Sequence, residues 1–215
     1  MTKEEFIQMN VEQFVMAYGV EQDRLRAMLP EGFHSLRPVL RINAEIWDGR
    51  VGWLELNTAV EADGKRGWLN IDFWQNIPFI KQGDTVLFQT DFLRISFTRT
   101  GAVGSCPAER DNDGCFFLGT SPALRPPEPI LANKAFCSCT FSWHFGPKDA
   151  HGVSIDKTLP AIPTAIKTHY PKQACSAKHA AAIPCEQVLG SYAVTFQRNS
   201  AYAPYPGFPA ATDIL

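Results

Sequence analysis

Two neighbouring segments alternate between apolar and polar side chains, and this alternation constrains the fold more than any other feature of the sequence. They are residues 39–46 (VLRINAEI) and 51–58 (VGWLELNT), and the link between them, Trp47-Asp48-Gly49-Arg50, has turn chemistry. Because successive side chains of a strand point to opposite faces, the pattern predicts an antiparallel hairpin. One face is aliphatic, and the other carries Arg41, Asn43, Glu45, Trp53, Glu55 and Asn57.

A third segment, residues 67–74 (GWLNIDFW), repeats the pattern. It is expected to place Trp68, Asn70, Asp72 and Trp74 on the polar face, and Leu69, Ile71 and Phe73 on the apolar face. Such a polar face either meets water or lines an interior. Water-facing sheets more often carry Lys, Thr and Glu than tryptophans, whereas ligand pockets combine aromatic walls with a few polar groups. The residues alone leave both interpretations open.

Composition sets the outer limits on fold and function. A chain of 215 residues with a net charge of −2 is long enough for one β-rich domain spanning residues 1–215. The charge gives no electrostatic reason to expect a nucleic acid or an anionic membrane as partner. No segment reaches the roughly 18 apolar residues of a membrane span. The acidic start lacks the apolar core of a signal peptide, so the expected location is the cytoplasm.

The remaining segments indicate a mainly β chain with few helices. Alternating or apolar runs predict further strands at 14–18, 85–92, 94–99, 115–118, 135–145 and 188–196. One helix is predicted at 21–29, where Leu25, Met28 and Leu29 have helical spacing and Pro30 follows. Strands joined by tight turns predict a largely antiparallel, closed or nearly closed barrel. The segment 111–114 has turn chemistry, and the proline-rich stretch 120–130 is expected to be a loop.

The six cysteines do not indicate a metal or redox site. None is arranged as Cys-x-x-Cys. In a strand over 135–145, Cys137 and Cys139 share a face with Phe141, and His144 points to the other face. These thiols are therefore interpreted as small buried hydrophobic groups, and no metal or cofactor is expected.

Several segments, in their order along the chain, resemble acetoacetate decarboxylase-like proteins. The first are 14–18 (FVMAY), 25–31 (LRAMLPE) and 37–41 (RPVLR), similar to that family's strand ending in tyrosine, Leu-Pro-Glu helix stop and Pro-x-x-Arg strand. The strand 52–55 (GWLE) is similar to its aromatic-x-Glu strand, and 183–191 (IPCEQVLGS) to its closing segment. The resemblance implies a cone-like β-barrel, usually assembled into homo-oligomers, with the active site inside.

The resemblance also implies decarboxylation of a β-keto acid through a lysine Schiff base, but several of the residues for it differ here. Counting from residue 83 places the tandem lysines near Asp91 and Phe92, and the chain has no Lys-Lys pair. The family's N-terminal arginine falls near Val11 and its first active-site acid at Asn43. Its second acid is kept, as Glu55.

Three classes of function follow. The first is a divergent lyase-like enzyme that acts on a small keto acid or related carbonyl compound without the usual lysine. It would use Glu55 as general acid/base, or recruit Lys81 or Lys134. The second is a non-catalytic binder of a small carboxylate or carbonyl ligand, and the third is an assembly module. For the first class Glu55 is the candidate catalytic residue. For the first two classes the candidate ligand-binding residues are Arg41, Asn43, Glu45, Asp72, Trp53 and Trp68.

Each of these residues also has a purely structural interpretation. Glu55 is then a solvent-facing charge, and Arg41 forms a salt bridge with Glu45 or Asp72. The tryptophans pack between subunits, because oligomer interfaces favour aromatic side chains. The two lysines are surface residues.

Overall fold

The hairpin expected around residues 47–50 is present, and its register decides which side chains share a face. Strand β3 (Val39–Trp47) pairs antiparallel with β4 (Val51–Ala62). Cross-strand partners include Arg41 with Asn57, Asn43 with Glu55, and Glu45 with Trp53. Asp48 and Gly49 have positive φ angles of 47° and 69°, and the backbone N–H of Arg50 donates to the carbonyl oxygen of Trp47 at 2.9 Å, so the three-residue link 48–50 contains a tight β-turn. The shared polar face of these two strands is therefore confirmed.

The computed structural model describes residues 8–90, 92–104, 116–117, 124–125, 135–145, 167–169 and 175–199. The other strands are β1 (Gln8–Val20), β2 (His34–Ser35), β5 (Lys65–Ile77), β6 (Phe79–Gln82), β7 (Thr85–Gln89), β8 (Leu93–Val103), β9 (Phe116–Phe117), β10 (Leu124–Arg125), β11 (Ala135–Phe145), β12 (Lys167–His169) and β13 (Cys185–Asn199). They form one sheet in the order β10-β9-β5-β4-β3-β1-β13-β11-β8-β7-β6, with β12 on β5 and β2 on β4. Among the described strands, only β5 and β9 pair in parallel. The mainly β, largely antiparallel architecture is confirmed.

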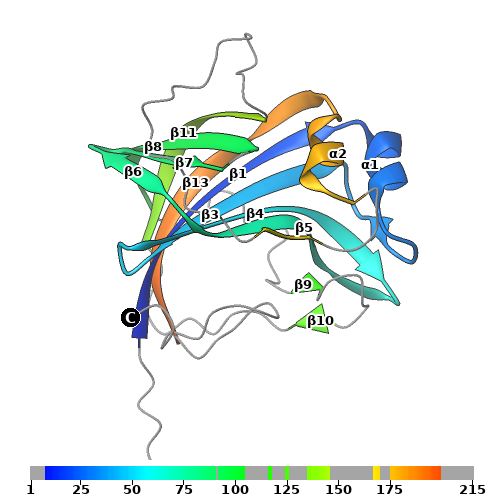
Figure 1. Ribbon diagram of the computed structural model, residues 1–215, viewed down its shortest axis with the longest axis horizontal. Helices are drawn as coiled ribbons and strands as arrows, with labels where there is room; N and C mark the ends of the chain where they lie inside the picture. Colours follow the sequence, from blue (N-terminus) through cyan, green and yellow to red (C-terminus); the bar gives the residue numbers. More distant parts are fainter. Residues whose placement is uncertain are drawn as a thin grey trace, which may run out of the picture.

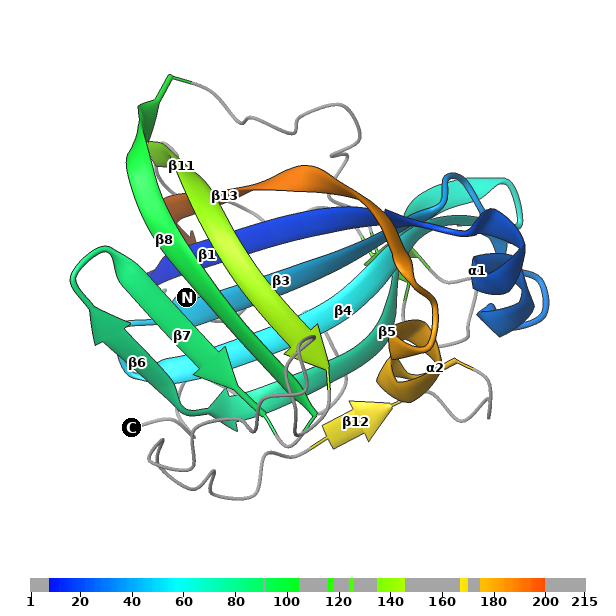
Figure 2. The same ribbon diagram turned by 90° about the horizontal axis from the view of Figure 1, so that it is seen from above.

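The sheet curls over one of its own faces. Strands β13 and β11 lie between β1 and β8 in the strand order. Nevertheless the ring of Phe14 on β1 lies 5.8 Å from that of Phe88 on β7 and 5.4 Å from that of Phe97 on β8. Figures 1 and 2 show β6, β7, β8 and β11 lying over β1, β3 and β4. Because the order of the described strands has two ends, the barrel is nearly closed rather than closed.

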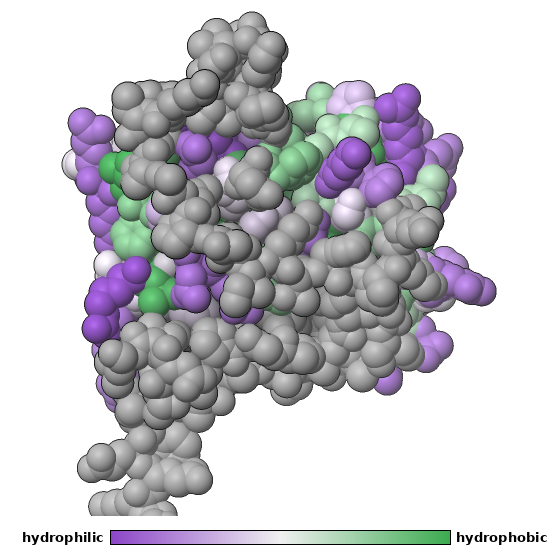
Figure 3. Space-filling model, in the orientation of Figure 1, coloured by the Kyte–Doolittle hydropathy of each residue, from purple (hydrophilic) through white to green (hydrophobic). Residues whose placement is uncertain are grey.

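Two short helices lie at one end of this sheet. Helix α1 (Gln22–Met28) buries Leu25 and Met28 and confirms the predicted helix. Helix α2 (Ala177–Ala181), in a segment with no assignment from sequence, contacts α1 (Figure 2). Hydrophilic side chains gather at the end of the molecule near α1 and the β4–β5 turn, where Lys65 and Arg66 are exposed (Figure 3). Neither described helix is long and apolar enough to cross a membrane.

Apolar side chains pack in two clusters on opposite faces of the central strands. The large cluster fills the inside of the curl and includes Leu40, Ile42, Leu54 and Leu56 with residues of β7 and β8. The small cluster lies on the other face of the central strands and contains Met9, Val11, Val15, Trp47, Trp53, Phe73, Tyr192, Val194 and Phe196. The polar side chains predicted on β3 and β4 therefore share their face with the small cluster.

A β-bulge in β5 changes the alternation expected for residues 67–74. Asn57 pairs with Asn70, but the next pair is Leu56 with Asp72, so Ile71 is the extra residue. Beyond the bulge, Asp72 and Trp74 turn to the face of the large cluster, and Phe73 turns to that of the small cluster. The expectation that Trp68, Asn70, Asp72 and Trp74 share one face is wrong for its last two residues.

The first and the last of the described strands lie side by side. Strand β1 pairs with β13 along its length, with Gln8 opposite Asn199. Both strands are longer than predicted. Strand β11 pairs with β13 only at residues 192–195 and pairs with β8 over a longer stretch.

Some expectations lie wholly or partly outside the described residues. These are the turn at 111–114, most of the loop at 120–130, Asp91 and Lys134.

Candidate functional site

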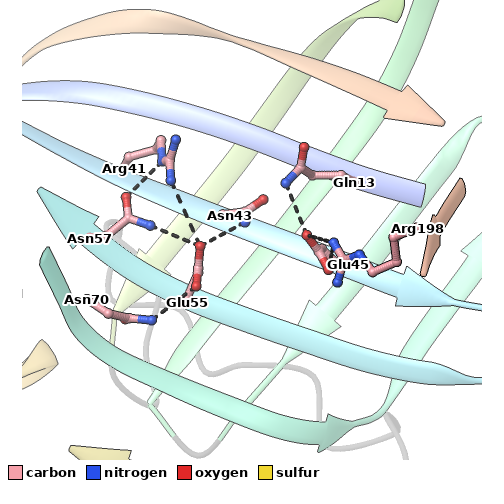
Figure 4. Close-up of polar contacts among 8 residues, drawn as sticks. All are labelled: Gln13, Arg41, Asn43, Glu45, Glu55, Asn57, Asn70 and Arg198. Atoms are coloured by element: carbon pink, nitrogen blue, oxygen red, sulfur yellow. Dashed lines mark hydrogen bonds and ion pairs between the residues drawn. The ribbon is translucent and has the colours of Figure 1, made fainter. Parts of the chain in front are cut away.

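The carboxylate of Glu55 is the centre of a buried polar cluster on β3, β4 and β5. Its side chain is only 7% exposed. Oε1 accepts hydrogen bonds from Nδ2 of Asn43 at 2.8 Å and Nδ2 of Asn57 at 3.0 Å, and Oε2 accepts one from Nδ2 of Asn70 at 3.0 Å. Figure 4 shows these amides converging on the carboxylate from three strands. Three N–H donors favour the ionised form of a carboxylate.

Arg41 adds a positive charge to this Glu55 cluster. Its Nη2 lies 3.9 Å from Oε1 of Glu55, and its Nε donates to Oδ1 of Asn57 at 2.8 Å. The guanidinium stacks on the indole of Trp68, 3.7 Å from the ring centroid, in a cation–π contact. Arg37 lies 5.5 Å from the same centroid. Arg41 is therefore held by a carboxylate, an amide and an aromatic ring.

The three amides of the Glu55 cluster differ in what their oxygens do. A carboxylate only accepts hydrogen bonds, so each amide must turn its NH₂ group toward Glu55 and its oxygen elsewhere. Oδ1 of Asn57 accepts from Arg41. Oδ1 of Asn43 and Oδ1 of Asn70 are buried and have no hydrogen-bond partner among the described residues. Two acceptors beside Glu55 are thus unsatisfied.

A second carboxylate, Glu45, lies on the same face and is tied to different partners. Its oxygens accept from Nε2 of Gln13 at 3.0 Å and Nε1 of Trp47 at 2.6 Å. Nη2 of Arg198 lies 3.0 and 2.9 Å from the two oxygens. Figure 4 shows this group beside the Glu55 cluster. The predicted residue Glu45 is therefore engaged in a buried ion pair.

Trp53 belongs to an aromatic stack in the small cluster. Its ring is stacked with that of Trp47 at 5.5 Å and with that of Phe73 at 4.9 Å. It is 2% exposed. It shares a face with Glu55 and packs within the small cluster.

Asp72 is the predicted site residue that the structure separates from the others. The β5 bulge turns it to the opposite face, where Oδ2 accepts a hydrogen bond of 2.6 Å from the backbone N–H of Ala177 at the start of α2. Burial, with a smaller effect of the Asp72 charge, raises the pKa of the nearby Cys175 thiol to about 12. Asp72 thus anchors α2 to the sheet.

The candidate lysine Lys81 lies on the opposite face from Glu55. Its Nζ contacts Oε1 of Glu12, whose other oxygen accepts from Arg99 at 2.7 Å. Glu12 shares the face of Phe14, a member of the large cluster. Phe92, one of the two residues at the expected tandem-lysine position, packs against Phe145.

Cys137 and Cys139 pack against the large cluster, as their alternation predicts. Burial is the main cause that raises the pKa of the Cys139 thiol to about 11. Within the described ranges, no three His, Cys, Asp or Glu side chains are grouped as metal ligands.

Of the eight residues labelled in Figure 4, four were not among the predicted site residues. Asn57 and Asn70 lie on the predicted polar face, and their parity with Glu55 was the available signal. Gln13 precedes the predicted strand 14–18, and Arg198 follows the predicted strand 188–196. Their strands had to be extended before their faces could be assigned.

Comparisons with known proteins identify similar structures but no similar sequence family. No family model and no curated protein sequence matches the chain. The structure of acetoacetate decarboxylase from Legionella pneumophila superposes on this chain with a TM-score of 0.55 and 12% sequence identity. The match covers 89% of this chain and 84% of the decarboxylase. An acetoacetate decarboxylase-like enzyme from Sphingomonas wittichii RW1 covers 93% of this chain and 94% of its own, with 11% identity and a TM-score of 0.49.

Proposed function

The chain has the acetoacetate decarboxylase-like fold, and from this premise we propose that it binds a small keto acid or related carbonyl compound at the Glu55 cluster and acts on it without a Schiff-base lysine. The observation that carries the proposal is the buried carboxylate of Glu55, held by three asparagines and faced by Arg41. Fold alone does not determine activity, so the argument rests on these side chains.

The composition of the cluster supports a binding role. A buried polar network is costly unless it is fully satisfied, and this one contains two unsatisfied amide oxygens. Packing of the sheet alone does not require such a network, since apolar residues of similar size would fill the same space. The guanidinium of Arg41 provides N–H donors of the kind that pair with a ligand carboxylate.

Glu55 is the proposed general base. An ionised carboxylate in a water-poor site takes a proton from carbon next to a carbonyl group, provided that Arg41 holds the substrate in place. Asp72 is excluded from the proposed site, because it lies on the other face.

One observation favours a non-catalytic binder as the second candidate. Both oxygens of Glu55 already accept hydrogen bonds from amides, and those bonds stabilise the charge that a base must give up when it takes a proton. Such a carboxylate is suited to holding the cluster in one geometry. Turnover measurements separate the two candidates.

The first test addresses the covalent route. A Schiff-base lysine must be neutral and must face the substrate carbonyl, whereas Lys81 pairs with Glu12 on the opposite face. The protein is incubated with acetoacetate and sodium borohydride and its mass is measured. We expect an unchanged mass and no carbon dioxide release above background. A reduced adduct on Lys81 or Lys134 would contradict the proposal and identify the nucleophile.

The second test addresses Glu55 itself. In Glu55→Gln one of the three amide donors faces an NH₂ group, so the cluster loses its geometry as well as its charge. We expect the affinity for pyruvate and acetoacetate, measured by calorimetry, to fall by at least about tenfold, as for removal of a charged hydrogen-bond partner. The matched control is Glu12→Gln, which removes a carboxylate from the opposite face and should leave the affinity unchanged. Equal binding by wild-type and Glu55→Gln protein would refute the proposed site.

A further inference from the structure

Two amide oxygens, for which the described part of the chain offers no hydrogen-bond partner, restrict the chemistry of the ligand. Asn43 and Asn70 are 5% and 1% exposed, and each has its NH₂ group fixed on Glu55. Neither amide can rotate by 180° to present N–H groups instead, because its oxygen would then face a carboxylate oxygen. The cluster therefore offers acceptors at both positions, whatever the ligand is.

Asn57 is an internal comparison for this argument. Its NH₂ group also donates to Glu55, but its oxygen accepts a hydrogen bond from Nε of Arg41. Both the nitrogen and the oxygen of this amide are therefore hydrogen-bonded within the cluster. The same strand pairing that satisfies Asn57 leaves Asn43 and Asn70 open on either side of Glu55 (Figure 4). Buried acceptors left open cost free energy that a ligand with donors would recover.

We infer that the ligand of the Glu55 cluster, the small carbonyl acid of the proposed function, also carries hydrogen-bond donors, hydroxyl or ammonium groups, near its carboxylate; this inference rests on the proposed function. Arg41 pairs with the ligand carboxylate, and the donors satisfy Oδ1 of Asn43 or Asn70. A ketone oxygen at the same position meets another acceptor and leaves both unsatisfied. The cluster thus selects a hydroxylated or aminated acid over a simple keto acid of the same size.

Matched ligand pairs test this selection. Calorimetric dissociation constants are measured for lactate against pyruvate, and for 3-hydroxybutyrate against acetoacetate, with 3-aminobutyrate as the ammonium probe. Within each pair the hydroxyl compound is expected to bind about fivefold to tenfold more tightly, the value of one net hydrogen bond. If 3-aminobutyrate binds more tightly than acetoacetate while the hydroxyl compounds do not bind more tightly than their keto counterparts, the donor is an ammonium group. That result would also support the inference.

Variants then locate the selection. In the double variant Asn43→Ala/Asn70→Ala the preference for the hydroxyl compound should fall to about one. The matched variant Asn57→Ala removes one hydrogen bond to Glu55, as each of the other two substitutions does. Unlike them, it does not remove an amide oxygen that is available to the ligand. It should weaken both members of a pair by the same factor and leave their ratio unchanged. Because the double variant risks unfolding, the ratio in the wild-type protein is decisive by itself.

The failures of the two proposals differ. If keto and hydroxyl acids bind equally well, with loss of both in Glu55→Gln, the inference about donors is wrong and the proposed function stands; a bound water then satisfies the two amides. If none of the probes binds, both are wrong.

Discussion

At the scale of single residues, the most demanding environment is that of the ion pair between Glu45 and Arg198. The two side chains are 5% and 3% exposed, and the guanidinium also lies 5.5 Å from the ring centroid of Phe196. Removing two charges from water is expensive, and the hydrogen bonds from Gln13 and Trp47 offset part of that cost. Removing one partner should therefore destabilise the fold more than replacing both partners with apolar residues of similar size.

A double-mutant cycle on this pair should show strong coupling. Arg198→Met leaves the Glu45 charge buried without its partner, and we expect a loss of about 3–5 kcal/mol in the free energy of unfolding. Glu45→Gln/Arg198→Met should cost less than the sum of the single changes, by about 1–3 kcal/mol. Urea unfolding gives all three values.

The exposed pair of Arg66 and Glu61, at 69% and 36% exposure, is the control for this cycle. Arg66→Ala should change the free energy of unfolding by less than about 1 kcal/mol. If Arg198→Met costs no more than Arg66→Ala, the buried pair does not have the role described.

A site residue could be predicted from the sequence only where the strand that carries it was itself predicted. The hairpin alternation correctly placed Arg41, Asn43 and Glu55 on one face, since the short turn fixes the register. Arg198 was missed because the alternation of residues 188–196 stops at Phe196, while β13 continues to Asn199. Which polar side chain contacts which depends on distances across strands, and alternation along one strand does not contain them.

At the scale of elements, Gly52 is the residue that permits β4 and β5 to pair as they do. A Cβ atom at this position would lie 2.2 Å from the carbonyl oxygen of Ile77. The ladder has a register shift between Gly52 and Trp53, and Asn76 on β5 has a positive φ of 52°. This register shift lies just before Trp53 and Glu55 in β4. It therefore determines which residues of β5 lie opposite them.

Gly52→Ala should therefore destabilise the protein by about 1–3 kcal/mol, the range for a side chain forced into a packed site. Because the contacted atom belongs to the backbone, the clash is relieved only by moving β5. The urea midpoint should fall at an unchanged m-value. Gly101→Ala is the control, since no atom of the residues that the structure describes lies within 4 Å of its added Cβ. Equal midpoints for the two variants would contradict this account.

Elements were predicted where periodicity was unbroken and missed where it was not. Residues 135–145 form a strand with the expected bounds. In β5 the sequence between Asn70 and Asp72 contains no glycine or proline to mark the bulge, so its effect on Asp72 was not foreseen. Helix α2 has only five residues, and the Asp72 carboxylate that accepts from its first N–H is 105 residues away in the chain. Local pattern carries no information about such a contact.

At the scale of the whole molecule, Glu12 joins strands that lie far apart in the sheet. It accepts from Lys81 on β6 and from Arg99 on β8, 69 and 87 residues away along the chain. These ion pairs link β1 to the strands that curl over it, next to the contacts of Phe14 with Phe88 and Phe97. The group therefore reports on whether the curl is intact.

This group should make the stability depend on pH. Burial opposes ionisation of Glu12, but the hydrogen bonds from Lys81 and Arg99 outweigh it and lower its pKa below 4.5. Its contribution to stability is therefore complete above about pH 4.5, the value for the unfolded chain, and is lost as the pH falls through the lower pKa of the folded state. The difference in unfolding free energy between wild-type protein and Glu12→Gln should shrink as the pH is lowered from 7 to 3. A difference that stays constant over that range would show that the ion pairs do not contribute.

The pairing of β1 with β13 has a consequence for how the chain matures during synthesis. Residues 8–20 are made before their partners at 185–199, which form the last of the described strands along the chain. Until then β1 has only β3 beside it, and one of its edges can associate with other chains. A chain arrested before residue 185 would hold an incomplete sheet, so β1 gains its second neighbour only after all the other described strands have been made.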